Sequence, residues 1–170
     1  MDSRPVPDGG PQAAVLFVSR RNNLRSVLAH ACLRHVAPAR FSVASCGVPG
    51  LLAPIHPAAA RVLADARIAL PPPPQHDWRA FLRAGAPRVD IVILLDPLAD
   101  VDVPRWPGQP DTALWSYPDL GARGDALAPA EVWQLLHSLR RRLEILANLP
   151  MRGVDRAELR SDLRDIAHSW

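Results

Sequence analysis

The sequence predicts an α/β protein with three layers, α/β/α, and a four-stranded, mainly parallel sheet. Two apolar runs, "AAVLFV" at 13–18 and "VDIVILL" at 89–95, have the near-continuous hydrophobicity of strands that are buried on both faces. Segments with apolar residues at helical spacing lie between these runs and after them. Strands that alternate with helices favour parallel pairing, because each helix carries the chain back across the sheet.

Four elements are predicted in the first 70 residues. Residues 13–18 form a strand that ends abruptly in polar residues, and residues 26–35 form a helix that begins near Ser26. Residues 41–47 alternate as a second strand that ends at a glycine, and residues 56–70 contain a helix. Proline lies in the first turn of that helix, where the missing amide donor costs least.

A run of four prolines, 71–74, must be an extended surface connector, because it fits neither a helix nor a central strand. After it we predict a short helix at 78–83, the clearest buried strand at 89–95, a fourth strand at 112–117 and a long helix at 129–149. The apolar stripe of the long helix consists of Val132, Leu136, Leu139, Leu143 and Leu146.

The length of 170 residues fits one ordinary domain with tails. We predict a disordered leader at 1–12, the domain at 13–149 and an amphipathic C-terminal helix at 150–170. The leader lacks the apolar run of a signal peptide, and no stretch reaches the length of a membrane span. The two cysteines lack the spacing of a disulfide scaffold or a zinc site. We therefore expect a cytoplasmic protein without a metal or another cofactor.

The basic residues are unusual in kind rather than in number. The net charge is only +3, but all 20 basic residues are arginine. One interpretation is composition bias, and the other is anion recognition, because guanidinium offers a planar fork of donors that matches phosphate or carboxylate. Nucleic acid is an unfavoured partner, since aromatic residues make up 5% of the chain and the arginines are scattered among 17 acidic residues.

A polar loop, "SRRNNLR" at 19–25, follows the first predicted strand and precedes the first predicted helix. Ligands of open α/β sheets bind beyond the carboxyl ends of the strands, so this loop lies at the expected ligand site. The N-terminus of a helix presents unpaired N–H groups and about half a positive charge. Together with Arg20, Arg21 and Arg25, these features predict a site for an oxyanion.

The sequence resembles the low-molecular-weight protein tyrosine phosphatases and the thioredoxin-coupled arsenate reductases, which share the phosphotyrosine phosphatase I-like fold. The family loop reads C-x-G-N-x-C-R-S, and this chain has "SRRNNLRS" at 19–26. Three further segments occur in the family order. They are "ASCG", "HPAAARVLADARI" and "RWPGQP…LWSYPDL", which stand beside S-A-G, H-P-x-A-x-x-x-L-x-x-x-G-I and W-P-G-x-P…W-x-x-P-D-P.

The resemblance implies a role for each matched residue. Ser19 stands at the position of the nucleophile, Asp119 at that of the general acid, and Arg25 at that of the arginine that clamps the oxyanion. Asn22 and Ser26 would hold the shape of the loop. The implied anion-binding set is Arg20, Arg21, Asn22, Asn23, Leu24, Arg25 and Ser26.

Two departures from the family loop decide the expected chemistry. Ser19 replaces the cysteine, and a hydroxyl has no comparable route to ionise, so we expect the covalent phospho-enzyme step to be lost. Arg21 replaces a glycine, and it either blocks the loop or strengthens its hold on an anion. A laboratory substitution would explain Ser19 alone, whereas natural divergence explains both changes.

The cysteine relay of an arsenate reductase is also missing. The positions that align with the further cysteines hold Leu24, Leu95 and Val103. Cys32 and Cys46 are better interpreted as buried packing residues. These departures favour a pseudophosphatase that binds phosphate, sulfate or a phosphorylated ligand. The alternatives are a residual phosphomonoester hydrolase that uses Ser19, and a scaffold that binds no anion.

The C-terminal segment carries a separate signal. A helix there places Leu159, Leu163, Ile166 and Trp170 on one stripe, with basic residues along one side and acidic residues along the other. Two such helices in parallel would match opposite charges, which predicts a homodimer contact. The alternative is that the helix packs back as a hairpin on the long helix at 129–149.

Overall fold

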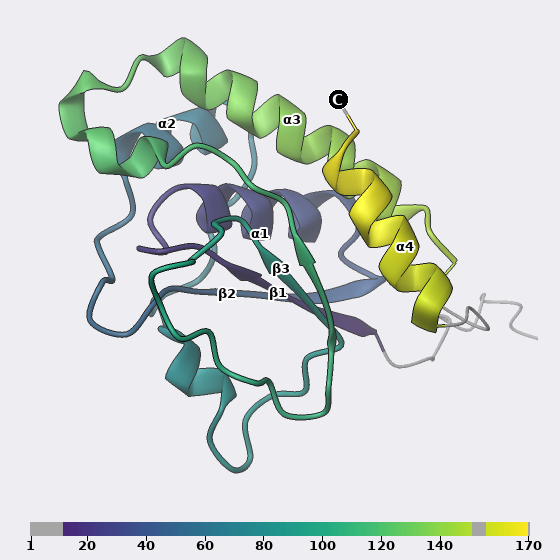
Figure 1. Ribbon diagram of the computed structural model, residues 1–170. Coiled ribbons are helices and arrows are strands. Elements are labelled where there is room, and N and C mark those ends of the chain that lie inside the picture. Colours follow the sequence, from purple (N-terminus) through teal and green to yellow (C-terminus); the bar gives the residue numbers. More distant parts are fainter. Residues whose placement is uncertain (1–11, 151–155, 170) are drawn as a thin grey trace, which may run out of the picture.

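A parallel sheet of four strands forms the centre of the molecule (Figure 1). The computed structural model describes residues 12–150 and 156–169. The strand order is β2-β1-β3-β4, so the chain starts inside the sheet and adds strands on both sides. Ala13 pairs with Phe41, and Val15 pairs with Ile91. The strands are β1 (Ala13–Val18), β2 (Phe41–Cys46), β3 (Ile91–Leu94) and β4 (Asp111–Leu114).

The helices follow the predicted order, with one addition. They are α1 (Arg25–Val36), α2 (Pro57–Asp65), the 3-10 helix η1 (Trp78–Phe81), the kinked 3-10 helix η2 (Leu120–Ala126), α3 (Pro129–Ala147) and α4 (Arg156–Ala167). The sequence analysis did not predict η2, because its glycines and short turns lack helical periodicity. The predicted strand at 112–117 is shorter in the structure, because the chain leaves the sheet after Leu114.

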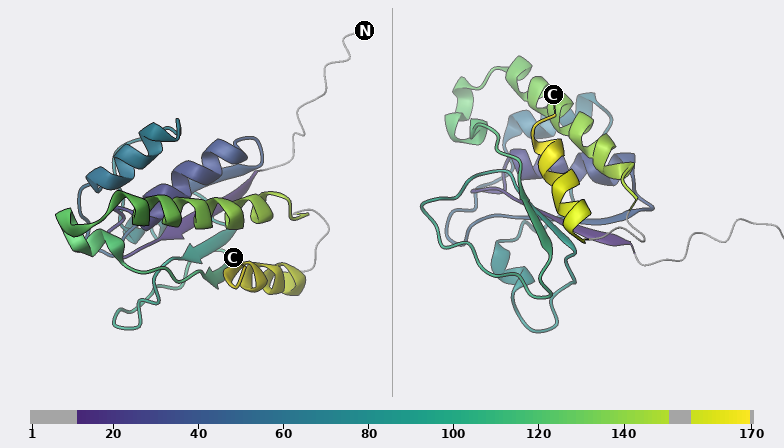
Figure 2. Two further views of the ribbon diagram at one scale, coloured as in Figure 1. Left: turned by 90° about the horizontal axis from the view of Figure 1, so that it is seen from above. Right: turned by 45° about the vertical axis from the view of Figure 1, so that its right-hand side comes forward.

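α1 lies between the sheet and the outer helices α2 and α3 (Figure 2). Nine residues of α1 are therefore buried, from Arg25 to Leu33, although the segment contains polar residues. His30 is one of them, and its Nδ1 is 2.8 Å from the Ser45 hydroxyl of β2. A helix covered on both sides has to pair each polar side chain internally.

A second, smaller core covers the opposite face of the sheet. Leu16 and Val18 of β1 contact side chains of η1 and of the segment after β3, including Trp78, Phe81 and Trp106. The third layer thus consists of a short 3-10 helix and loops. The predicted α/β class with a four-stranded parallel sheet is confirmed.

α4 packs on the same molecule, beside β4 and α3 (Figure 2). Leu163 and Ile166 are buried in the main core. The indole of Trp115 donates to the Leu163 carbonyl at 3.0 Å, and Arg160 Nε donates to Asp111 Oδ1 at 2.8 Å. The predicted homodimer contact through Leu159, Leu163 and Ile166 is therefore not supported, because an intramolecular contact covers this stripe. Trp170, the fourth predicted member, lies outside the described residues, as does the predicted leader up to residue 11.

We expect the protein to sediment as a monomer of 18.6 kDa at micromolar concentration. The reason is that Leu163 and Ile166 are already buried and Leu159 is half-buried, so the described part of the stripe offers a second copy little apolar surface. Sedimentation velocity over a range of concentrations measures this directly. A concentration-dependent shift to twice the mass would contradict the expectation and restore the dimer hypothesis.

In the described part of the chain, no helix combines the length and the apolar character that crossing a bilayer requires.

Candidate functional site

The 19–24 loop lies at the carboxyl end of β1 and leads directly into α1. Its carbonyls point outward to neighbouring segments. Val48 N donates to Arg20 O at 3.1 Å, Ala53 N to Arg21 O at 3.1 Å, and His56 N to Asn23 O at 2.9 Å. The Gln75 side chain donates to Asn22 O at 2.5 Å. Four consecutive carbonyls are thus satisfied from outside the loop.

The loop amides have no corresponding partners. Within the described residues, no hydrogen bond runs from the backbone N–H of any residue between 20 and 27 to a protein acceptor. Residues 22–26 are nevertheless buried. A buried amide without an acceptor costs about 1–3 kcal/mol. Successive free N–H groups at a helix start form a concave array of the kind that binds anions.

The backbone bend that shapes this loop falls on Asn22, whose φ is +48°. Asparagine enters the left-handed region more easily than most residues. Arg21 is not among the residues with positive φ, so its Cβ does not conflict with the turn. The left-handed turn thus falls on Asn22, and Arg21 does not need the positive φ that glycine adopts readily.

A short chain of hydrogen bonds determines what the Ser19 hydroxyl can do. Ser19 Oγ lies 2.6 Å from Ser26 Oγ, and Ser26 Oγ donates to Asn22 Oδ1 at 2.7 Å. The Asn22 amide nitrogen donates to the His76 carbonyl at 3.4 Å, which fixes its orientation. The Ser26 hydroxyl has one proton and donates it to Asn22 Oδ1. In the hydrogen bond between the two serines, Ser19 Oγ is therefore the donor and Ser26 Oγ the acceptor. The chain ends on an amide oxygen, which is not a base.

The Arg25 guanidinium is held on several sides, and only 3% of the residue is exposed. Nη1 donates to the carbonyls of Leu95 and Tyr117 at 3.2 and 3.1 Å. Nη2 donates to Asp96 Oδ2 at 2.8 Å and lies 3.1 Å from Asp119 Oδ1. These partners follow β3 and β4, so the sheet positions the cation at the mouth of the loop.

Asp119 contacts two arginines of the loop at once. Its Oδ1 pairs with Arg25, and its Oδ2 pairs with Arg21 Nη1. A general acid has to present a proton to a leaving oxygen, whereas both oxygens here accept from guanidinium groups. Arg20 points to another carboxylate, since its two terminal nitrogens bind Asp100 at 3.0 and 2.7 Å. The guanidinium of Arg20 therefore has its pKa raised, first by the hydrogen bonds to Asp100.

The structure brings together most of the residues predicted for the site, with two exceptions. The Leu24 side chain is buried in the core, so this residue can offer only its amide. The Asn23 side chain turns away and donates to the Gly121 carbonyl at 3.4 Å. Sequence reasoning missed Asp96, although it directly follows a strongly predicted strand at the edge where ligands bind.

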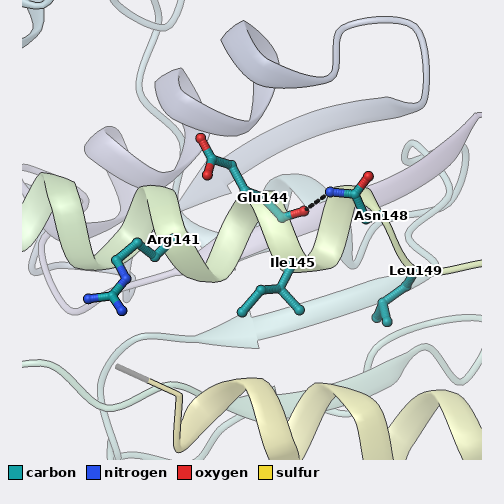
Figure 3. A pocket seen from close by; sticks show the side chains of 5 residues that line it. All are labelled: Arg141, Glu144, Ile145, Asn148 and Leu149. Carbon is teal, nitrogen blue, oxygen red and sulfur yellow. Dashed lines mark hydrogen bonds between the residues drawn. The ribbon is translucent and has the colours of Figure 1, made fainter.

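Two hollows on the surface of the described residues contain no residue of the loop. One, of about 540 Å³, lies on α3 and is lined by Arg141, Glu144, Ile145, Asn148 and Leu149 (Figure 3). The other, of about 400 Å³, lies between η1 and the segment after β3. At the mouth of the loop, Arg21 and Arg25 pair with Asp119. Among the described residues, no cluster of histidine, cysteine and carboxylate side chains could hold a metal ion.

The two cysteines are buried, as predicted. Burial raises the pKa of the Cys32 thiol to about 11 and raises that of Cys46 further. We expect neither thiol of the folded protein to react rapidly with an aromatic disulfide reagent near neutral pH, since the thiolate is the reactive form. Two equivalents should react after unfolding in guanidinium. Rapid labelling of either cysteine in the native protein would show a reactive thiol and contradict this.

Comparison with known proteins supports the fold. No protein-family model matches the chain, and no curated protein matches it in sequence. Solved structures do match. An arsenate reductase in the phosphate binding state has a TM-score of 0.64 and 24% identity over 80% of this chain and 97% of that one.

Two further structures agree with this result. An arsenate reductase from Archaeoglobus fulgidus has a TM-score of 0.62 and 20% identity over 79% of this chain and 99% of that one. A mutant of YwlE from Bacillus subtilis has a TM-score of 0.60 and 20% identity over 80% of this chain and 97% of that one. The chain therefore has the fold shared by arsenate reductases and low-molecular-weight phosphatases.

Proposed function

We propose that the protein is a pseudophosphatase, which binds a phosphate-like oxyanion in the 19–25 loop and does not turn it over. The observation that carries this proposal is the array of buried loop amides without protein acceptors, next to the buried Arg25 guanidinium. An oxyanion in the loop would accept from these amides, and the helix start would stabilise its charge. The neighbour solved in its phosphate binding state makes phosphate the natural probe.

The position of Ser19 supports the absence of turnover. A serine attacks phosphorus only when a base removes its proton. The Ser19 proton is donated to Ser26, and the chain of hydrogen bonds ends on the Asn22 amide. Asp119 is paired with two arginines instead of being free to serve a leaving group. The reductase relay is also missing, because Leu24 and Leu95 are buried apolar side chains.

The proposal is tested by calorimetric titration of orthophosphate into three proteins. We expect saturable binding by the wild type and by Arg164→Lys, a control that changes an exposed arginine of α4. Arg25→Lys keeps the charge but loses the fork of donors, so its affinity should fall by about tenfold or more. Lysine is preferable to alanine here, because it leaves a cation beside the buried Asp96.

Turnover is measured separately with an aryl phosphate. We expect no hydrolysis above that of Ser19→Ala. Hydrolysis that disappears in Ser19→Ala would replace the pseudophosphatase with a residual phosphomonoester hydrolase. Failure to bind phosphate, both in the wild type and in Asp119→Asn, which frees Arg21 and Arg25 from their shared carboxylate, would leave the scaffold hypothesis.

A further inference from the structure

The Asp119 carboxylate binds the guanidinium groups of the loop arginines in the way that a bound oxyanion would. One carboxylate oxygen pairs with Arg25 and the other with Arg21, so the group bridges two guanidinium forks. Arg21 is one of the residues that depart from the family pattern, and its side chain is directed to this carboxylate. An incoming anion would need the same donors.

The charges at the mouth of the loop balance only while Asp119 is in place. Arg20, Arg21 and Arg25 face Asp96, Asp100 and Asp119. Asp100 binds Arg20, and Asp96 is held beneath Arg25 with only 10% of its side chain exposed. Release of Asp119 would therefore leave one net positive charge at the mouth and free donors on two arginines.

Asp119 is the second residue of a segment, 118–127, that lies against the loop. Leu120, next to Asp119, and Leu127 are its buried anchors, and residues 121–124 between them are exposed or half-exposed. The segment is tied down by Asn23, which donates to Gly121 O, and by His56 Nε2, which is 3.1 Å from Gly124 O. Arg123 pairs with Glu131 on the surface at 2.6 Å.

The contact between this segment and the loop is close. A Cβ added to Gly121 would be 2.6 Å from the Asn23 amide oxygen, a distance that forces a shift. The segment also changes direction at Gly124, whose φ is +59°. Such a segment, held by a few polar contacts between two buried anchors, can open locally at lower cost than the core elements.

We propose that Asp119 is a built-in competitor of the oxyanion and that the 118–127 segment is a lid that its two ion pairs keep closed. This inference rests on the proposed function. Phosphate enters only as Asp119 leaves Arg21 and Arg25. Because only open molecules bind phosphate, the apparent affinity equals the affinity of the open state multiplied by the fraction of molecules that are open. Arg21 thus both closes the site and adds a second guanidinium for the anion.

The test compares phosphate titrations of the wild type, Asp119→Asn and Asp100→Asn. Each variant removes one negative charge at the mouth of the loop. Of the two substituted residues, Asp119 contacts Arg25, whereas Asp100 contacts Arg20. We expect Asp119→Asn to bind phosphate at least about tenfold more tightly than the wild type, and Asp100→Asn to stay within about threefold. Gly121→Ala, which changes no charge, should also tighten binding, because its methyl group displaces the Asn23 amide and so removes the hydrogen bond that ties the segment to the loop.

Hydrogen exchange supplies a readout of the lid itself. Saturating phosphate should speed exchange of the amides in the 118–127 segment of the wild type and slow that of the loop amides at 20–27.

The outcomes separate the two proposals. An equal gain in phosphate affinity in Asp119→Asn and Asp100→Asn would show that net charge alone causes the gain. It would overturn the lid hypothesis, while the proposed binding of phosphate would stand. Unchanged or weaker binding by Asp119→Asn would also overturn the lid alone. Absence of phosphate binding in the wild type, Asp119→Asn and Gly121→Ala would overturn the proposed function, and the lid with it.

Discussion

Replacement of Arg25 by methionine is expected to lower the free energy of unfolding by about 3–5 kcal/mol. The side chain is 3% exposed and binds two carboxylates and two backbone carbonyls. Its loss would leave buried Asp96 with only the longer contact to Arg20 Nε at 3.7 Å, and it would leave the carbonyls of Leu95 and Tyr117 without the Arg25 donor. Urea unfolding of the two proteins, followed by circular dichroism, measures the difference.

The double variant Arg25→Met and Asp96→Asn shows whether the buried charge causes the loss. Asparagine removes the uncompensated charge, so the double variant should regain part of the stability that Arg25→Met loses. A loss of less than about 1 kcal/mol in Arg25→Met would indicate that Arg25 is not a structural ion-pair partner. The role of Arg25 would then be limited to binding a ligand.

Acidification from pH 6.5 to pH 4 is expected to cost about 3 kcal/mol of stability through His30. Burial against the sheet, with a smaller contribution from Arg34, lowers the pKa of His30 from 6.5 to about 4. Between these values the unfolded chain binds a proton that the folded protein does not, so stability falls as the pH falls. Above pH 6.5 both states are neutral at this residue, and below pH 4 both are protonated.

His30→Asn should flatten this part of the stability profile, because its amide can still reach Ser45 but does not titrate. Ser45→Ala is the matched control. It removes the hydrogen bond and keeps the buried imidazole, so the slope between pH 6.5 and pH 4 should remain. A profile of His30→Asn that is parallel to that of the wild type would assign the slope to other groups.

Local sequence patterns predict most of this fold. The runs at 13–18 and 89–95 could be recognised as buried strands, because both of their faces are covered and their apolar residues are nearly continuous. The helix η2 could not be recognised, since it is held by contacts with Asn23 and His56 rather than by its own periodicity. The amphipathic pattern of α4 predicted either a second copy or the long helix at 129–149 as its partner, whereas α4 packs beside both β4 and α3 of the same chain.

The site was predicted in part for a similar reason. The order of strand, loop and helix located the oxyanion loop, and the motif pointed to Asn22, Arg25 and Ser26 as residues that act together. The motif did not show that Asp96 and Asp119 would both pair with Arg25. These partners are 71 and 94 positions away in the chain, and only the parallel sheet brings them to one edge.

The packing of α4 against β4 has a consequence for the behaviour of the protein at high concentration. β4 is an outermost strand, and 45% of its Leu114 is exposed. Outer strands can recruit strands of other molecules and so initiate aggregation. α4 lies beside this strand and is fastened to it through Arg160 and Trp115. We therefore expect the helix to shield this strand from other molecules and so to keep the protein in solution.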